Sequence, residues 1–262
     1  MFDTRRHVDE DVLAQGQPRQ LIAPIAAVLK RPEVDTMQLT QALMGERVTM
    51  LEDLGAFAQV QLTRDSYVGY IESAALTADI VETTHRVCVP STFIYPQANL
   101  KTRPVQFVGM NAEVSVIGTD GKFAGLATGG FIFADHLAAK TVHEKDFVDV
   151  AAQFLHTPYY WGGKSVHGID CSGLVQVALH ACGITAPRDS DMQEKELGTL
   201  INDHQHLRRG DLVFWAGHVG IMQDANQLLH ANGHWMKTVS EPLADAIART
   251  PTPVTAVKRL SN

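Results

Sequence analysis

The sequence predicts an α+β protein in which two small β-barrels precede a domain that packs helices on an antiparallel sheet. Short strand-like runs separated by turn residues occupy about residues 45–80 and again about residues 84–137. From about residue 145 the apolar spacing becomes helical, and more strand-like runs follow between residues 212 and 231. A helix on an antiparallel sheet is the α+β arrangement, and 262 residues suffice for two or three domains.

The composition is that of a globular protein with a sizeable core. Hydrophobic residues make up 45% of the chain and charged residues 19%, and the formal net charge is −7. This charge implies no broad basic face, so it argues against nucleic acid and against an anionic membrane as partners. The N-terminal residues contain no apolar run typical of a secretory signal, and no stretch approaches the roughly 18 apolar residues that span a bilayer. We therefore expect a cytoplasmic protein.

The first predicted barrel follows an N-terminal segment, and the two together form a domain at residues 1–80. Helical pieces are expected around residues 20–30, within a stretch that contains several prolines. Strand-like runs then lie at residues 48–51, 58–62 and 67–71, with a hairpin turn at residues 63–66. Short strands so close together suit a small barrel better than a β-α-β unit.

A second barrel is predicted at residues 81–138. Its strand-like runs lie at residues 105–108, 113–117 and 123–127, and Asp120-Gly121 supplies a hairpin signal between the last two. The two blocks resemble weak copies, since each ends in a glycine-containing strand followed by a polar or alanine-rich tail. A linker is expected at residues 138–145.

Residues 139–262 are predicted to form the α+β domain. Apolar residues between 147 and 154 follow the i, i+3, i+4, i+7 spacing of one helix face. A glycine-containing loop comes next, and a second helix then begins at Cys171 and ends at Gly183. The sheet is predicted from strand-like runs at residues 212–215, 218–222 and 228–231.

Cys171 is the candidate nucleophile. It stands where a loop becomes a helix, and the unpaired backbone N–H groups and the helix dipole there favour a thiolate. The alternative is a small buried core residue, since free cysteines are usually buried and inert. Cys88 and Cys182 are predicted to be core residues. Three sparse cysteines without a CxxC pair predict neither a disulfide framework nor a zinc site, and no cofactor is expected.

Two histidines could serve this cysteine. A nucleophilic cysteine needs a base and a group that orients the base. His218 opens one predicted strand and His230 closes the next, with a turn at residues 225–227 between them. A hairpin would bring the rings together, with His218 as base and His230 as its orienting partner. The alternative for each is a surface or satisfied core residue, because the chain contains 12 histidines.

These residues lie in a series of motifs that resembles NlpC-type cell-wall cysteine peptidases, which have a papain-like fold. The resemblance spans roughly residues 145–260 and rests on Tyr159-Tyr160-Trp161-Gly162-Gly163, Asp170-Cys171-Ser172-Gly173-Leu174-Val175, Arg209-Gly210-Asp211-Leu212-Val213-Phe214-Trp215, His218-Val219-Gly220-Ile221 and Leu229-His230-Ala231. It implies that Cys171 attacks a peptide bond next to D-glutamate, that His218 activates the thiol and that His230 orients His218. It also places Tyr159 near the oxyanion site, where the N–H of Cys171 is the other expected donor.

The two predicted barrels resemble the bacterial SH3-like domains of one subgroup, the γ-D-glutamyl-L-diamino acid endopeptidases. That subgroup acts on free murein peptides with an N-terminal L-alanine. The resemblance implies that Asp189 pairs with the alanine ammonium, while Arg188, Ser172 and Ser190 hold the α-carboxylate of the γ-linked D-glutamate. It also implies that the substrate is contacted by Glu46, Tyr70, Trp161 and Asp170.

Each of these substrate residues has a simpler interpretation. Asp189 and Asp170 could be plain helix N-caps. Glu46 could be a solvated residue at a strand edge, Tyr70 could lie in the core of the barrel, and Trp161 could serve packing alone.

The resemblance thus implies a cysteine endopeptidase that hydrolyses the γ-D-glutamyl-L-diamino acid bond of free murein peptides during murein recycling. Murein-derived peptides are the expected partners, with no nucleic acid, membrane or metal involved. The alternatives are a murein-peptide-binding module without catalysis and an acyltransferase or amidase on the same scaffold. The sequence does not distinguish which diamino acid is preferred.

Overall fold

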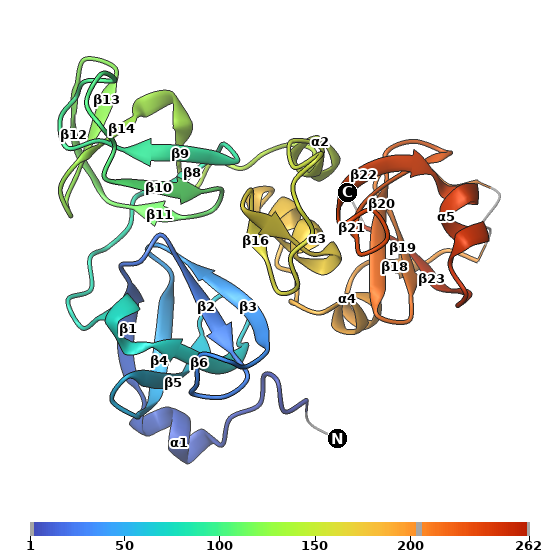
Figure 1. The fold of residues 1–262 in the computed structure, drawn as a ribbon, viewed down its shortest axis with the longest axis horizontal. Helices are drawn as coiled ribbons and strands as arrows, with labels where there is room; N and C mark the ends of the chain where they lie inside the picture. The colour runs from blue at the N-terminus through green and yellow to red at the C-terminus, as the bar shows by residue number, and fades with distance from the viewer. Residues whose placement is uncertain (1–2, 203–205, 261–262) are drawn as a thin grey trace. The chain divides into compact units, whose positions relative to one another are not determined.

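The computed structural model describes residues 3–202 and 206–260. The chain divides into two compact units, Met1–Val142 and His143–Asn262. The first unit is β-rich, and the second combines helices with a six-stranded sheet and a two-stranded one (Figure 1). The architecture is therefore α+β, as the sequence predicts.

The first unit begins with a short helix and a seven-stranded antiparallel sheet. Helix α1 spans Glu10–Gln15, and its N-cap Asp9 accepts the N–H of Asp11. The sheet has the order β3-β2-β6-β5-β4-β1-β7. Its strands are β1 (Gln17–Leu21), β2 (Ile25–Leu29), β3 (Gln38–Leu43), β4 (Arg47–Asp53), β5 (Phe57–Leu62), β6 (Val68–Glu72) and β7 (Leu76–Thr77). Along β5, Ala58, Val60 and Leu62 alternate inward, which is the period of a half-buried strand.

The expectation of helical pieces around residues 20–30 is wrong, because β1 and β2 occupy this region. Pro24 stands between the two strands, and proline disrupts the interior of a helix. Strand β2 is completed by pairing with β3, where Ile25 lies opposite Leu43. The conformation is therefore set by a partner strand and not by the local apolar spacing.

The second half of the first unit contains three smaller antiparallel sheets, β10-β9, β11-β8-β15 and β12-β13-β14. The strands are β8 (His85–Val87), β9 (Ser91–Ile94), β10 (Gln106–Gly109), β11 (Glu113–Val114), β12 (Val116–Asp120), β13 (Phe123–Leu126), β14 (Phe131–Phe133) and β15 (Leu137–Ala139). The predicted hairpin is observed, with Asp120 opposite Phe123 and Gly121 at φ +58°. The closure of these sheets, or of the first sheet, into barrels stays a prediction.

Two other expectations need correction in this region. The linker expected at residues 138–145 is in part a strand, because β15 pairs with β8 as far as Ala139 opposite His85. The run at residues 113–117 is interrupted at Ser115, which separates β11 from β12. The core here is formed by apolar residues from both halves of the unit. Its members include Leu43, Val87, Ile94, Val108, Ala112, Val114, Leu126 and Ile132.

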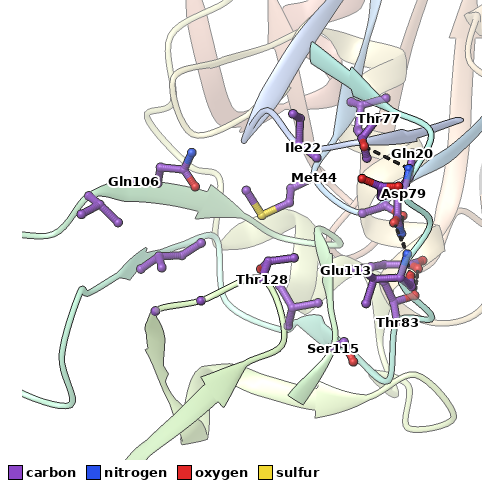
Figure 2. Close-up of a pocket in the computed structure, with 18 of the residues that line it drawn as sticks. Gln20, Ile22, Met44, Thr77, Asp79, Thr83, Gln106, Glu113, Ser115 and Thr128 are labelled. Carbon is purple, nitrogen blue, oxygen red and sulfur yellow. Dashed lines mark hydrogen bonds between the residues drawn. The ribbon is translucent and has the colours of Figure 1, made fainter. Parts of the chain in front are cut away.

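The first unit also contains a pocket of about 560 Å³ between its two halves (Figure 2). Ile22 and Met44 from the first half face Thr128 from the second, and Glu113 lies at one side. All of its lining residues belong to this unit, so the pocket is separate from Cys171 and the two histidines.

The second unit packs helices on a six-stranded antiparallel sheet with the order β18-β23-β19-β20-β21-β22. Helix α3 contacts β20 and β21, while α5 contacts β21 and β22 (Figure 1). The helices are α2 (Phe147–Ala152), α3 (Cys171–Ala181), α4 (Ser190–Glu196) and α5 (Leu243–Arg249). The strands are β16 (Lys164–Ser165), β17 (Gly168–Ile169), β18 (Thr199–Leu200), β19 (Asp211–Trp215), β20 (His218–Met222), β21 (Gln227–Asn232), β22 (Lys237–Pro242) and β23 (Val254–Arg259).

The cysteines occupy three different environments, and all three are free thiols. Cys171 is buried at the start of α3, whereas Cys88 and Cys182 are only half-buried. Cys88 follows the end of β8, and Cys182 is the C-cap of α3, so neither is enclosed as fully as a core residue. No helix in the described part of the chain is long and apolar enough to cross a membrane.

Candidate active site

The first turn of α3 positions Cys171. Asp170 is the N-cap, and its Oδ1 accepts the N–H of Gly173 at 2.7 Å. Cys171 is the first helical residue, so its own N–H has no acceptor inside the helix. Most of α3 is buried, from Leu174 to Leu179, which fixes the helix against the sheet. The cysteine is therefore held at a rigid helix N-terminus.

Glycines bring the loop before α3 onto its first turn. Gly162 has φ +76° and donates its N–H to Asp170 Oδ2 at 2.7 Å. A Cβ on Gly163 would lie 2.4 Å from the carbonyl oxygen of Gly168, so only glycine fits there. The paired glycines of the Tyr-Tyr-Trp-Gly-Gly loop are thus explained by backbone contacts beside the helix start.

Asp170 also forms a buried ion pair with Arg188. The guanidinium donates from Nη1 to Oδ1 at 3.0 Å and from Nη2 to Oδ2 at 2.7 Å, and the Arg188 side chain is only 1% exposed. Nη1 also donates to Ser172 Oγ at 2.8 Å. Burial alone would lower the pKa of Arg188, but the charge and hydrogen bonds of Asp170 raise it above its usual range. Two of the guanidinium nitrogens of Arg188 are therefore already bonded to the N-cap carboxylate of Asp170.

The segment that carries Arg188 is tied to α3 by buried amides. Gln193 Nε2 donates to the carbonyl oxygens of Ser172 and Pro187, both at 2.9 Å. Gln176 Nε2 donates to the carbonyl of Ala186 at 3.0 Å. These bonds hold the segment in register with the first two turns of the helix.

The two histidines meet across the β20–β21 hairpin. His218 is the first residue of β20, and its ring lies 5.7 Å from that of Trp215, its partner on β19. His218 Nε2 lies 2.8 Å from His230 Nδ1. The proximity that the spacing predicts is therefore observed, while the roles of base and orienting partner stay predictions.

The thiol and the first histidine are both neutral near pH 7. Burial raises the pKa of Cys171 to about 12, with a further increase from the charge of Asp170. The expectation that the helix N-terminus favours a thiolate is therefore wrong for the resting protein, because the cost of burying the charge outweighs the effect of the helix dipole. The backbone N–H of Val219, the residue after His218, acts in the opposite direction and places the thiol against β20. Burial, followed by the electrostatic cost of a second positive charge beside His230, lowers the pKa of His218 to about 3. The resting pair is thus a thiol and an imidazole, and the proton must move as the sulfur attacks.

Tyr159 stands beside the thiol. Its backbone N–H donates to the carbonyl of Met236 at 2.9 Å, which ties the loop to the β21–β22 turn. Burial raises the pKa of Tyr159 above its usual range, and negative charge on Cys171 and Asp170 adds to the effect. The hydroxyl therefore stays protonated and can donate a hydrogen bond.

Residues 156–249 match the NlpC/P60 family, and residues 28–76 match the Bacterial dipeptidyl-peptidase Sh3 domain. The chain contains an NlpC/P60 domain. This confirms the resemblance to NlpC-type cysteine peptidases and assigns the helix-borne Cys171 and the two histidines to that domain. The Sh3 match runs from within β2, through η1, the 3₁₀ turn at Ser73–Ala75, to the first residue of β7, and it supports an SH3-like first half of the first unit.

Two curated relatives match more than two thirds of this chain. A gamma-D-glutamyl-L-lysine dipeptidyl-peptidase of Bacillus cereus is 28% identical over 68% of this chain and 60% of its own length. One of Bacillus subtilis is 28% identical over 75% of this chain and 73% of its own length. The match therefore spans less than two thirds of the Bacillus cereus relative. A crystal structure of an NlpC/P60 family protein from Bacillus cereus has the same fold, with a TM-score of 0.78 at 21% identity over 93% of this chain and 99% of that one.

Of the other predicted substrate residues of the NlpC/P60 domain, Asp189 and Ser190 lie at the start of α4 and Trp161 lies in the loop before β16. Asp189 is the N-cap of α4, but its side chain makes no capping hydrogen bond, so the plain N-cap interpretation does not account for it. Ser190 is buried at the first helical position. Trp161 is 58% exposed, so the alternative that it serves packing alone is not supported. Their contacts with substrate stay predictions.

Glu46 and Tyr70 lie in the first unit. Glu46 is buried, and its Oε1 is 3.2 Å from Arg64 Nε, a distance of ion pairing without hydrogen-bond geometry. The alternative of a solvated strand-edge residue is therefore wrong for Glu46. Tyr70 is half-buried in β6, opposite Leu29 of β2. The assignment of Glu46 and Tyr70 to the substrate stays a prediction.

Two charged residues at the end of the histidine pair, Glu241 and Arg249, lie outside the motifs that the sequence displays. His230 Nε2 lies 2.7 Å from Glu241 Oε1, and Arg249 Nη1 donates to Glu241 Oε2 at 2.7 Å. Glu241 lies opposite Leu228 in the β21–β22 register, two positions from His230 on the same face. The pairing register of β21 and β22 places Glu241 beside His230. That register is set by the turn between the two strands, and this turn has no strong sequence signal. Within the described residues, no group of three or more His, Cys, Asp or Glu side chains is arranged to hold a metal ion.

Proposed function

We propose that this protein is a cysteine peptidase that hydrolyses the bond between γ-D-glutamate and an L-diamino acid in murein peptides. The observation that carries the proposal is a buried cysteine at a helix N-terminus, placed against the strand that begins with His218, in an NlpC/P60 domain. The names of the Bacillus relatives support the choice of bond.

The reaction begins when Cys171 sulfur attacks the carbonyl carbon and its proton passes to His218. The resulting oxyanion would accept hydrogen bonds from the N–H of Cys171 and from the hydroxyl of Tyr159. Collapse breaks the C–N bond, and His218 returns the proton to the leaving amine of the diamino acid. Water then attacks the thioester, gives its proton to His218 and releases the γ-glutamyl carboxylate and the thiol.

Recognition of the acyl side is the finer part of the proposal. Asp189 would receive the N-terminal ammonium of L-alanine, which is consistent with a carboxylate that does not cap its own helix. Ser172 and Ser190, next to the guanidinium of Arg188, would receive the α-carboxylate of D-glutamate. Glu46 and Tyr70 are proposed to add to the selection of a free N-terminus. A place in murein recycling and a cytoplasmic location complete the proposal.

The experiment compares L-Ala-γ-D-Glu-L-Lys, its diaminopimelate analogue and intact murein as substrates, with products identified by mass spectrometry. The proposal expects L-Ala-D-Glu and the free diamino acid from the tripeptides. N-acetylation of the alanine should abolish cleavage, whereas equal rates for free and acetylated peptides would contradict the proposed ammonium site. Transfer of the dipeptide to an added amine, without hydrolysis, would instead identify an acyltransferase. Cell fractionation of the native host tests the location.

A further inference from the structure

Glu241 joins the histidine pair to an arginine. Its side chain is 11% exposed, and that of His230 is 3% exposed. Arg249 from α5 donates to both carboxylate oxygens, and the indole N–H of Trp235 donates to Oε2 at 3.4 Å. Both carboxylate oxygens are therefore held by donors other than His230. Arg249 occupies one lone pair of Oε1, so one lone pair remains to accept a hydrogen bond from His230.

The charge on Glu241 decides where the protons of both histidines lie. Burial alone would raise its pKa, but hydrogen bonds from Arg249 and His230 lower it to about 2, so the group is a carboxylate at pH 7. A carboxylate only accepts, and His230 Nε2 must therefore carry a proton. Burial holds His230 neutral by lowering its pKa, which leaves Nδ1 unprotonated. His218 Nε2 then donates to that nitrogen, and its own Nδ1 keeps a lone pair.

Asn232 competes with Glu241 at the same ring nitrogen. Its Oδ1 accepts the N–H of Trp235 at 2.8 Å, which turns its amide nitrogen, a donor, toward His230 Nε2 at 3.0 Å. The amide would favour a lone pair on Nε2, but the ionised Glu241 lies closer, at 2.7 Å, and a charged acceptor forms the stronger hydrogen bond, so Glu241 takes the proton at this end of the ring. Among the described residues, the charged groups that act on the histidines are Asp170 at the start of α3, Glu241 on β22 and Arg249 on α5, with Asp245 acting on Arg249.

We propose that Glu241, clamped by Arg249, is a positioning residue that fixes His230 as the Nε2–H tautomer and so leaves Nδ1 of His218 as the base for the reaction. This inference rests on the proposed function for its catalytic consequence. The tautomers themselves do not depend on which substrate is cleaved. A purely structural ion pair would not dictate the proton positions of two rings.

The decisive variant is Glu241→Gln. Arg249 would keep the amide oxygen of the glutamine, which turns the amide NH₂ toward His230 Nε2 and favours the opposite tautomer. We expect kcat to fall about a hundredfold or more with little change in KM, since an amide in place of the carboxylate that orients a catalytic histidine can cost roughly 10⁴-fold. Glu241→Asp should restore part of the loss. Arg209→Gln, which breaks a surface arginine–carboxylate pair of the same unit, is the matched control.

The readout independent of substrate is nitrogen-15 NMR of the imidazole rings in the Cys171→Ala background. The inference expects His230 protonated at Nε2 in the otherwise native protein and at Nδ1 after Glu241→Gln, with no change after Arg209→Gln. In proteins that retain Cys171, the pH profile of its alkylation by iodoacetamide should shift after Glu241→Gln and stay unchanged after Arg209→Gln. The inference would be overturned if His230 were the Nδ1–H tautomer with Glu241 in place. It would also be overturned if Glu241→Gln left both the His230 tautomer and kcat unchanged. If the tautomers switch but no murein peptide is cleaved, the proposed function fails and the positioning role stands.

Discussion

His218 Nε2 lies 2.8 Å from His230 Nδ1, and this contact links the thiol side of the hairpin to the Glu241–Arg249 pair. The hairpin places the two rings diagonally on one face of neighbouring strands. Three groups in a row, His218, His230 and Glu241, thus separate the proposed reaction at Cys171 from the positive charge of Arg249 on α5.

The two histidines should differ in importance. His218→Ala removes the proposed base and should reduce kcat to background, whereas His230→Ala leaves the base and should cost about 10²–10³-fold. Steady-state kinetics with the tripeptide substrate measures both. His85→Ala, in the first unit, serves as the control. Equal losses for His218→Ala and His230→Ala would contradict the separate roles.

The pH profile of activity should be flat through neutrality. The pKa of His218 is held near 3 and that of Cys171 near 12, so neither group titrates between about pH 5 and 8. We therefore expect kcat/KM to show no acid limb at the ordinary histidine pKa of about 6.5. A bell-shaped profile with an apparent pKa near 6.5 would show that His218 titrates as an exposed histidine.

Stability should fall with pH below 6.5. The unfolded chain protonates its histidine at about 6.5 while folded His218 stays neutral down to about pH 3, so the unfolded state binds more protons in this window. Each pH unit below 6.5 should cost about 1.4 kcal/mol through His218. Urea unfolding between pH 4.5 and 6.5 measures the slope, and His218→Gln should reduce it. An unchanged slope in this variant would refute the prediction.

The buried pair of Asp170 and Arg188 should be costly to break on one side. Arg188→Met leaves a buried carboxylate without its counter-charge and should lower the free energy of unfolding by about 3–5 kcal/mol. The double variant Asp170→Asn with Arg188→Met should lose less than the sum of the two single losses. A double-mutant cycle by urea denaturation tests this, and strict additivity would mean that the pair does not act as a unit.

Gly163 should tolerate no side chain. A Cβ would lie 2.4 Å from the Gly168 carbonyl oxygen, so Gly163→Ala must displace backbone beside the start of α3. We expect a destabilisation of about 1–3 kcal/mol together with lower activity. Gly118→Ala is the matched control, because a Cβ there meets no atom within 4 Å. Thermal unfolding of both variants measures the difference. Equal stability of Gly163→Ala and Gly118→Ala would contradict the prediction.

The parts of the fold that follow local spacing were predictable from sequence. Helix α3 has apolar residues on a helical period between a capping aspartate and Gly183, and the β20–β21 hairpin follows from two strand-like runs around one turn. Residues 20–30 were not predictable in this way, because β1 and β2 gain their conformation by pairing with β4 and β3. Local pattern does not contain such pairings.

The same distinction holds for the site. Cys171, His218 and His230 stand in motifs that the sequence displays. Glu241 and Arg249 reach His230 only after β22 pairs with β21 and α5 follows it, so their side chains meet through tertiary structure. The ion pair of Arg188 with Asp170 likewise joins residues 18 positions apart, and the motif that contains Asp170 does not indicate it.

Cys171 is the proposed nucleophile for the γ-D-glutamyl bond. Cleavage of L-Ala-γ-D-Glu-L-Lys is measured with the wild-type protein and with Cys171→Ala, and folding of both is verified by circular dichroism. We expect release of lysine by the wild-type protein and none by the variant at equal stability. Release of lysine at the same rate by folded Cys171→Ala would contradict it.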